Sequence, residues 1–203
     1  MNVYDFDNTI FIPDSSYCFV RYCARHYLRA VCTAMPASLW QLVLYLRDGR
    51  TDAQKLKEAM FSFLNRIDNV DRVVEEFWEE HFGRVEDWYL RQRRDDDLII
   101  SASPEFLLRP VAERLGVSLI ATPMNPFTGK IEGRNCHDEE KVRRYQEEYA
   151  DVRIENFYSD SLWDAPMARL AEKAWMVKEH ALRPWPEDEE DGRRRGRKRS
   201  RRK

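Results

Sequence analysis

Two carboxylates stand two residues apart near the start of the sequence. Asp5 and Asp7 belong to the run Val-Tyr-Asp-Phe-Asp-Asn-Thr, which begins as a short β-compatible segment and then loses strand propensity. Side chains at i and i+2 of an extended chain point the same way, so both carboxylates are expected on one side of a loop. Because close carboxylates repel each other, the pair favours a divalent metal ion with oxygen ligands, although an ordinary turn and helix cap would use the same residues.

Three later segments offer further groups that phosphoryl transfer needs, each at a predicted strand end or helix start. Ser101 ends the apolar run 98–100, and its hydroxyl can donate to a phosphoryl oxygen. A serine there can also cap a helix, but Ser103, directly before Pro104, suits that role better. We therefore expect Ser101 in the site and Ser103 at the start of the next helix.

The other two segments carry a lysine and two further acids. Lys141 lies near the head of a predicted polar helix, where its cation can offset the charge of a transferring phosphoryl group; taken alone it reads as a surface lysine. Asp160 and Asp164 follow an apolar strand and are four residues apart, and Asp164 can equally serve as a helix N-terminal cap. With the first pair of acids, these residues predict a phosphoryl-transfer site.

The order of these segments resembles the four motifs of the haloacid dehalogenase superfamily. The pattern Asp-x-Asp-x-Thr, strand-Ser, Lys, strand-Asp-x-x-x-Asp spans roughly residues 3–178. The helical stretch between the first two motifs resembles the cap of the phosphoserine-phosphatase-like branch. The resemblance implies a magnesium-dependent phosphatase that hydrolyses a phosphomonoester, either a small metabolite or a lipid head group.

The resemblance also implies a role for each matching residue. Asp5 would be the nucleophile that forms an aspartyl-phosphate, and Asp7 the general acid and base. Mg²⁺ would be bound by Asp5, by the backbone carbonyl of Asp7 and by Asp160. The remaining matches would assist: Thr9 by orienting the first loop, Asp164 by supporting the metal shell, and Ser101 and Lys141 by holding the transferring oxygens.

Two functions other than a phosphatase are also compatible with these residues. A phosphotransferase or mutase would share every catalytic residue. A non-catalytic binding protein on the same fold would use its charged C-terminal tail instead. The chain also has Ser101-Ala102-Ser103-Pro104 where phosphoserine phosphatases usually have Ser-Gly-Gly, and these side chains would crowd the pocket. Phosphoserine itself is therefore not the expected substrate.

Short apolar strands alternate with helices in the second half of the chain. This alternation predicts an α/β fold, a Rossmann-like three-layer core with a mainly parallel sheet. The expected strands cover 98–100, 117–121, 154–158 and 174–177, and the expected helices 104–115, 138–149 and 165–172.

The segment between the first two strands predicts an inserted all-helical cap. One helix is expected to begin at Thr51, and the apolar residues from Val70 to Trp88 trace one face of a long helix. The predicted organisation is a core of residues 1–13 and 92–183, a helical cap of 14–91 and a disordered charged tail of 184–203.

Two parts of the predicted cap bear on the substrate. Arg21 and Arg25 fall on one helical face, where they bind an anionic substrate or form a solvated surface. The stretch 31–46 has no charged residue, but it is too short and too interrupted to span a bilayer. A buried cap helix is the favoured interpretation, and an interfacial helix of a lipid phosphatase is the alternative.

Composition limits the remaining classes. With 203 residues, 43% hydrophobic and 34% charged, the chain is globular rather than wholly disordered. Its net charge of −2 hides nine basic residues within 192–203, so residues 1–191 carry −11. The tail is expected to be solvated or to contact an anionic membrane or nucleic acid, and no obligate protein partner is expected. The cysteine pattern and the lack of a secretory segment favour the cytoplasm, with a peripheral membrane position as the alternative.

Overall fold

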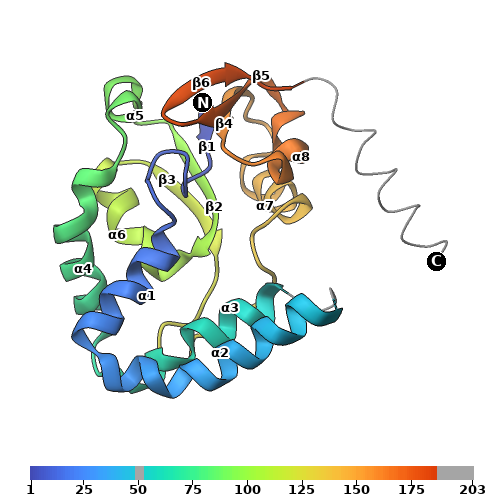
Figure 1. Ribbon diagram of the computed structural model, residues 1–203. Coiled ribbons are helices and arrows are strands. Elements are labelled where there is room, and N and C mark those ends of the chain that lie inside the picture. Colours follow the sequence, from blue (N-terminus) through green and yellow to red (C-terminus); the bar gives the residue numbers. More distant parts are fainter. Residues whose placement is uncertain (49–52, 187–203) are drawn as a thin grey trace.

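The computed structural model describes residues 1–48 and 53–186. Six strands form one sheet in the order β3-β2-β1-β4-β5-β6 (Figure 1). Neighbouring strands are parallel except for the antiparallel pair of β5 and β6. The strands are β1 (Asn2–Tyr4), β2 (Leu98–Pro104), β3 (Ser118–Thr122), β4 (Ile154–Ser159), β5 (Ala171–Lys178) and β6 (Ala181–Pro184).

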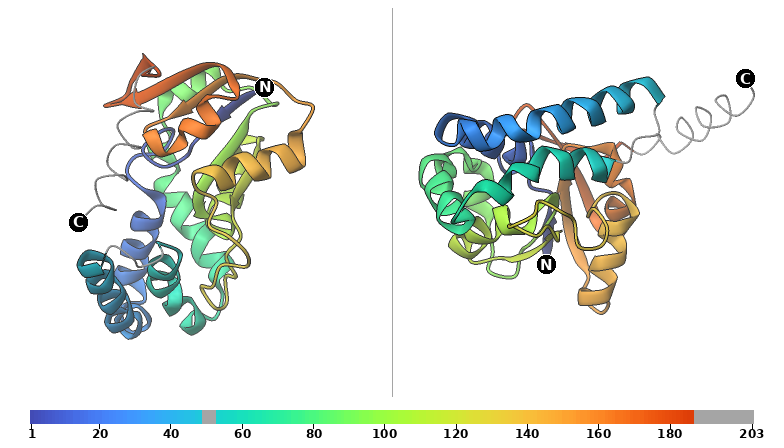
Figure 2. Two further views of the ribbon diagram at one scale, coloured as in Figure 1. Left: turned by 90° about the vertical axis from the view of Figure 1, so that its right-hand side faces the viewer. Right: turned by 90° about the horizontal axis from the view of Figure 1, so that it is seen from below.

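Helices cover both faces of the sheet, which confirms the predicted α/β architecture (Figures 1 and 2). The α-helices are α1 (Ser15–His26), α2 (Leu28–Asp48), α3 (Ala53–Phe61), α4 (Val70–His81), α5 (Asp87–Gln92), α6 (Glu105–Leu115), α7 (Glu139–Tyr149) and α8 (Ala165–Ala168). Short 3-10 helices cover Ser62–Arg66, Phe82–Arg84 and Leu162–Asp164.

The strands alternate their side chains between two buried clusters, as the pleat of a sheet requires. Leu98 and Ile100 of β2 pack in the cluster that also includes residues of α7 and α8. Ile99 points to the other face, into the larger cluster that includes residues of α1, α4 and α6. Because β2 is buried on both faces, its apolar run is continuous rather than alternating.

Strand β1 lies at the centre of the sheet. It pairs with β2 on one side and with β4 on the other. From β2 the sheet extends outward to β3, and from β4 it extends in the opposite direction to β5 and β6. In open α/β sheets, ligands bind outside the carboxyl ends of the strands at such a switch point. The loop that follows β1 therefore occupies the expected ligand-binding position.

Every described element between β1 and β2 is helical. α4 and α5 pack against the core: the indole nitrogen of Trp78 donates to the carbonyl of Leu107 in α6 at 2.6 Å, and Tyr89 contacts Tyr4 of β1 edge to face. α2 and α3 lie together at the other end of the helical segment (Figure 1). The predicted helix start at Thr51 lies outside the described residues.

The single long helix predicted for 70–88 is wrong. α4 ends at His81, and a 3-10 turn over Phe82–Arg84 and an extended Val85 separate it from α5. Val85 is nevertheless buried, so it continues the apolar spacing without belonging to the helix. Helical periodicity cannot distinguish one continuous helix from two that bury the same side.

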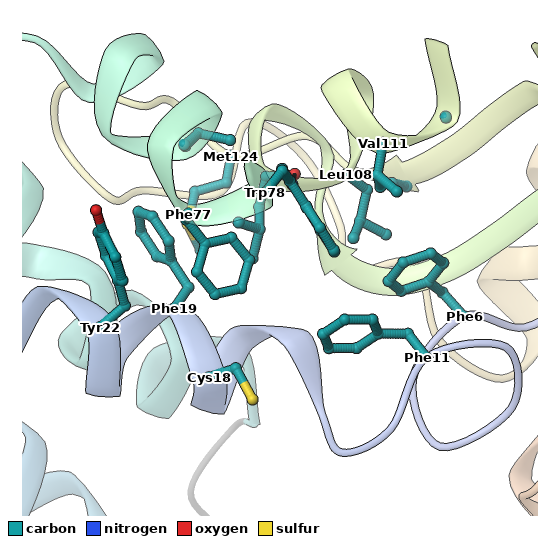
Figure 3. Packing of buried hydrophobic residues seen from close by; sticks show 14 of the residues in the cluster. Phe6, Phe11, Cys18, Phe19, Tyr22, Phe77, Trp78, Leu108, Val111 and Met124 are labelled. Carbon is teal, nitrogen blue, oxygen red and sulfur yellow. Dashed lines mark hydrogen bonds between the residues drawn. The ribbon is translucent and has the colours of Figure 1, made fainter. Parts of the chain in front are cut away.

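Aromatic packing fixes the loop after β1. Phe6 and Phe11 stack with ring centroids 5.6 Å apart, and Trp78 meets both rings edge on. Phe19 of α1 and Phe77 of α4 extend this packing into the helical segment (Figure 3). Removal of these large aromatic surfaces from water anchors the loop that carries the first two carboxylates.

The C-terminal part differs from prediction in three places. The helix expected over 165–172 ends at Ala168, and residue 172 belongs to β5. β6 was not predicted, because this edge strand has only four residues and all of them are exposed. Residues 184 and 185, which were predicted to belong to the tail, are instead part of the folded chain: Pro184 lies in β6 and Trp185 packs against Phe157. Residues 187–203 lie outside the described part.

The prediction of a buried helix over 31–46 is wrong for most of the side chains that the structure describes. This stretch lies within α2, and Val31 is buried. Met35, Leu39 and Trp40 are each 60% exposed or more. No helix in the described ranges is long and apolar enough to cross a membrane.

Candidate active site

The carboxyl ends of β1, β2 and β4 bring three predicted residues to one pocket. Asp5 directly follows β1, and its backbone N–H donates to the carbonyl of Tyr158 in β4 at 2.8 Å. Ser101 lies in β2, and Asp160 directly follows β4. All three line a pocket of about 550 Å³, which also includes the acids Asp7 and Asp164.

The loop after β1 is held by a tight backbone turn. The carbonyl of Phe6 accepts hydrogen bonds from the backbone N–H groups of three residues, 9, 10 and 11. Asn8 adopts a left-handed conformation with φ of 56°, which Asn tolerates better than most residues. These backbone hydrogen bonds hold the loop in a fixed turn, from which it presents both carboxylates.

Thr9 links this loop to the end of β4. Its hydroxyl accepts from the backbone N–H of Asp160 at 3.0 Å and lies 3.5 Å from Oδ2 of Asp5. Thr9 is fully buried. It therefore lies where it can orient the loop.

Lys141 bridges two of the acids. Its Nζ lies 2.6 Å from Oδ1 of Asp5 and 2.8 Å from Oδ2 of Asp164, and the lysine is 2% exposed. Ser159 donates to the same oxygen of Asp164 at 2.7 Å. Lys141 is therefore not a surface lysine. Asp164 occupies the N-cap position of α8, but its buried side chain contacts Lys141 and Ser159 and makes no cap hydrogen bond.

Asp7 is held by two hydrogen bonds from different elements. The backbone N–H of Ser15 donates to Oδ1 at 2.6 Å, and the hydroxyl of Ser103 donates to Oδ2 at 2.5 Å. Ser103 was predicted to cap α6, but Pro104 occupies the N-cap position and no side chain caps this helix. The site therefore includes a serine that sequence reasoning assigned elsewhere.

Ser101 and Ser103 are joined to each other as well. The backbone N–H of Ser103 donates to Oγ of Ser101 at 3.0 Å, and both serines are buried. This contact places the Ser101 hydroxyl at the pocket wall, beside Asp5 and Asp7.

Lys57 of α3 enters the site from the helical segment. Its Nζ donates to the carbonyl of Ala102 and to Oδ1 of Asn135, both at 2.7 Å. Burial lowers the pKa of Lys57 to about 8, although the charges of Asp7 and Asp14 oppose the shift. The sequence pattern missed this residue, because its partners lie 45 and 78 residues away.

Burial raises the pKa values of the acids in the pocket. The pKa of Asp5 rises to about 8, although Lys141 opposes the shift. That of Asp7 rises to about 6, with Asp14 adding to the effect of burial and Ser103 opposing it. Burial also raises the pKa of Asp160, against the charge of Lys178. An additional positive charge in the pocket would therefore stabilise the ionised form of each carboxylate.

The pocket composition suits a hard divalent cation. Five aspartates line it, against two lysines. Within the described residues, no three Asp, Glu, His or Cys side chains stand close enough to hold a metal ion by themselves. Mg²⁺ typically takes only one or two carboxylates and completes its shell with waters and substrate phosphate, so this donor set fits it.

Arg21 and Arg25 do not line the pocket. Both are exposed on α1, beyond the first turn of the helix. The pocket instead includes Asp14, Ser16 and Tyr17 from the start of α1. Of the two interpretations of these arginines, the structure favours solvated surface.

Comparisons with known proteins agree with this architecture. The family model of haloacid dehalogenase-like hydrolases matches residues 3–169. Protein CicA of Caulobacter vibrioides is 28% identical over 187 residues, which cover 84% of this chain and 82% of CicA. A crystal structure of a protein with unknown function from Bordetella pertussis Tohama I is 25% identical, with a TM-score of 0.73 over 97% of this chain and 95% of that one.

A phosphoserine phosphohydrolase-like protein from Francisella tularensis subsp. tularensis SCHU S4 is also similar in structure. It is 15% identical, with a TM-score of 0.57 over 89% of this chain and 88% of that one. At this identity, the likeness concerns the fold alone.

Proposed function

The chain belongs to the family of haloacid dehalogenase-like hydrolases, and on that premise we propose that it is a magnesium-dependent phosphatase acting on a phosphomonoester. The substrate is a small metabolite or a lipid head group. The contact of Lys141 with both Asp5 and Asp164 in a pocket beside Ser101 carries the proposal. It places a buried cation beside a carboxylate at the end of the central strand, where a transferring phosphoryl group needs one.

Asp5 is the nucleophile in this proposal. A carboxylate oxygen of Asp5 forms a bond to phosphorus while the bond from phosphorus to the leaving oxygen breaks, which leaves an aspartyl-phosphate. Lys141 and the hydroxyl of Ser101 stabilise the negative charge on the phosphoryl oxygens. Thr9 keeps the Asp5 loop in register with the end of β4.

Asp7 is the general acid and general base in this proposal. It gives a proton to the leaving oxygen in the first step and takes one from the water that attacks the aspartyl-phosphate in the second, which regenerates Asp5 and releases phosphate. A pKa near 6 suits both tasks near neutral pH. The hydrogen bonds from Ser15 and Ser103 fix the carboxylate while it exchanges the proton.

The side chains of Asp5 and Asp160 and the backbone carbonyl of Asp7 would hold Mg²⁺, with Asp164 supporting them. When bound, the ion would neutralise the carboxylates and the incoming phosphoryl charge. We propose that residues 1–13 and 92–183 form the catalytic core and that 14–91 act as a cap. Lys57 and Tyr17 support this division, because they reach the pocket from the helical segment.

Release of phosphate from an aryl phosphate, measured with and without Mg²⁺, tests the proposal. We expect activity that requires Mg²⁺ and is lost in Asp5→Asn. Asp151→Asn makes the same chemical change at an exposed turn and should retain activity. An inert parent across a broad panel of phosphate esters, or a fully active Asp5→Asn, would refute hydrolysis at this site. Transfer of phosphate to a second substrate without its release would instead indicate a phosphotransferase or mutase.

A further inference from the structure

A stripe of large apolar side chains on α2 faces solvent. The stripe consists of Leu28, Met35, Leu39, Trp40 and Val43, with exposed fractions of 60%, 60%, 63%, 61% and 44%. Large exposed apolar patches on soluble proteins mark interaction surfaces more often than chance exposure does. The stripe is therefore a candidate docking surface.

The geometry of α2 makes the stripe continuous. At 3.6 residues per turn, positions 28, 35, 39 and 43 lie close to one line along the helix, with 40 beside it. Ala30 lies on the opposite side and Val31 at the border of the stripe, and both are buried. Among its described side chains, α2 thus buries these two near its start and exposes the stripe. The helix lies at the edge of the molecule in two views (Figures 1 and 2).

The charge around the stripe has one sign. Between Asp14 and Asp48 the sequence contains four arginines and no acidic residue. Arg21, Arg25 and Arg29 are exposed on α1 and on the first turn of α2. This basic segment differs from residues 1–191 as a whole, which carry a net charge of −11. This surface therefore suits a partner that is both apolar and anionic.

Two other occupants fit less well. Residues 187–203 contain no apolar side chain, so the C-terminal segment cannot cover the stripe with apolar surface. A second copy using the same stripe in a symmetric dimer would cover the apolar side chains but would offer no anionic group to Arg21, Arg25 and Arg29. An anionic lipid surface offers both acyl chains and negative head groups.

We propose that α2 docks this protein on anionic membranes, with the stripe at the boundary between head groups and acyl chains and the three arginines at the head groups. Helices that lie in the membrane surface combine Trp and Leu on one side with Arg or Lys on the other. No described helix can cross a bilayer, so the proposal concerns binding to one face of it. The inference does not depend on the proposed phosphatase function.

Vesicle co-sedimentation of the full-length chain tests the proposal. The probes are vesicles of phosphatidylcholine alone and of phosphatidylcholine mixed with phosphatidylglycerol. We expect binding to the mixed vesicles and a loss of about tenfold or more in affinity for Leu39→Ser/Trp40→Ser, given the apolar area removed. Leu90→Ser/Leu182→Ser is the matched control, because it changes two exposed leucines in α5 and β6, at the other end of the molecule (Figure 1).

Charge reversal tests whether the three arginines contact the head groups, and fluorescence tests whether Trp40 enters the membrane. Arg21→Glu/Arg25→Glu/Arg29→Glu should remove the preference for the anionic vesicles. The blue shift of tryptophan emission on vesicle binding should be smaller in Trp40→Phe, while binding itself persists. Unfolding temperatures close to the parent's would show that the exposed substitutions leave the fold intact.

Three results would overturn the proposal. The parent does not bind the mixed vesicles, the Leu39→Ser/Trp40→Ser variant binds them as well as the parent does, or the stripe proves to hold a dimer. In the second case the binding depends on charged groups elsewhere in the chain and not on the stripe. In the third, sedimentation equilibrium would show a dimer that this variant dissociates while vesicle binding is unchanged.

Discussion

The hydrogen bond from Ser103 to Asp7 makes a quantitative prediction about catalysis. The hydroxyl of Ser103 is buried and donates to Oδ2 of Asp7 at 2.5 Å. A hydrogen bond to a charged group contributes about 1.5 to 3 kcal/mol. Since about 1.4 kcal/mol corresponds to a factor of ten in rate, loss of this interaction from the transition state in Ser103→Ala should lower kcat by at most about 10- to 100-fold.

The same substitution should shift the pH profile. The Ser103 hydroxyl stabilises ionised Asp7 and so opposes the burial that raises its pKa to about 6. Without the hydroxyl, the pKa of Asp7 rises further. Because Asp7 must be ionised to take a proton from water, the acidic limb of kcat should move to higher pH.

The assay is steady-state phosphate release from an aryl phosphate at saturating Mg²⁺ across a range of pH. Ser103→Thr keeps a hydroxyl and should retain most of the activity. Ser16→Ala removes a hydroxyl 2.9 Å from that of Ser103 without touching Asp7, so it should have a smaller effect. A Ser103→Ala variant with the parental kcat and an unmoved acidic limb would refute the assigned role.

Three further predictions concern charge. Lys141→Met leaves two buried carboxylates without their cation, so in urea titrations without Mg²⁺ it should lower the free energy of unfolding by about 3 kcal/mol or more. Assayed with Mg²⁺, the variant should release no phosphate, and parental stability would contradict the ion pairs. Asp160→Asn should raise the Mg²⁺ concentration for half-maximal activity about tenfold or more, and an unchanged requirement would exclude it as a ligand. Arg143 and Arg144 hold the pKa of Glu140 at about 2, so the stability advantage over Glu140→Gln should be complete above about pH 4.5 and disappear as pH falls toward 2; a difference independent of pH in unfolding experiments would contradict this.

Local sequence signals predicted which residues meet at the carboxyl edge of the sheet. Apolar runs that end in Asp5, Ser101 and Asp160 indicated parallel strands, and the carboxyl ends of such strands meet at one edge. The structure places these residues in one pocket, with Lys141 between two acids. Their catalytic roles remain predictions.

The residues that sequence reasoning missed depend on distant contacts. Ser103 has the sequence context of a helix cap, and only the approach of the first loop, 96 residues away, turns its hydroxyl to Asp7. Lys57 looks like any lysine of an amphipathic helix until α3 meets the end of β2. The uncharged stretch in α2 correctly indicated a helix, but burial depends on what covers a face, and Trp40 remains exposed.

The most direct test of the phosphoryl-transfer site is to identify the phosphorylated residue. The enzyme is mixed with a phosphate ester and Mg²⁺, quenched in acid during turnover and analysed by peptide mass spectrometry. We predict a phosphoryl group on Asp5 in the parent and none in Asp5→Asn. Turnover with the phosphoryl group on another residue, or with no phosphorylated enzyme at any time during the reaction, would contradict nucleophilic attack by Asp5.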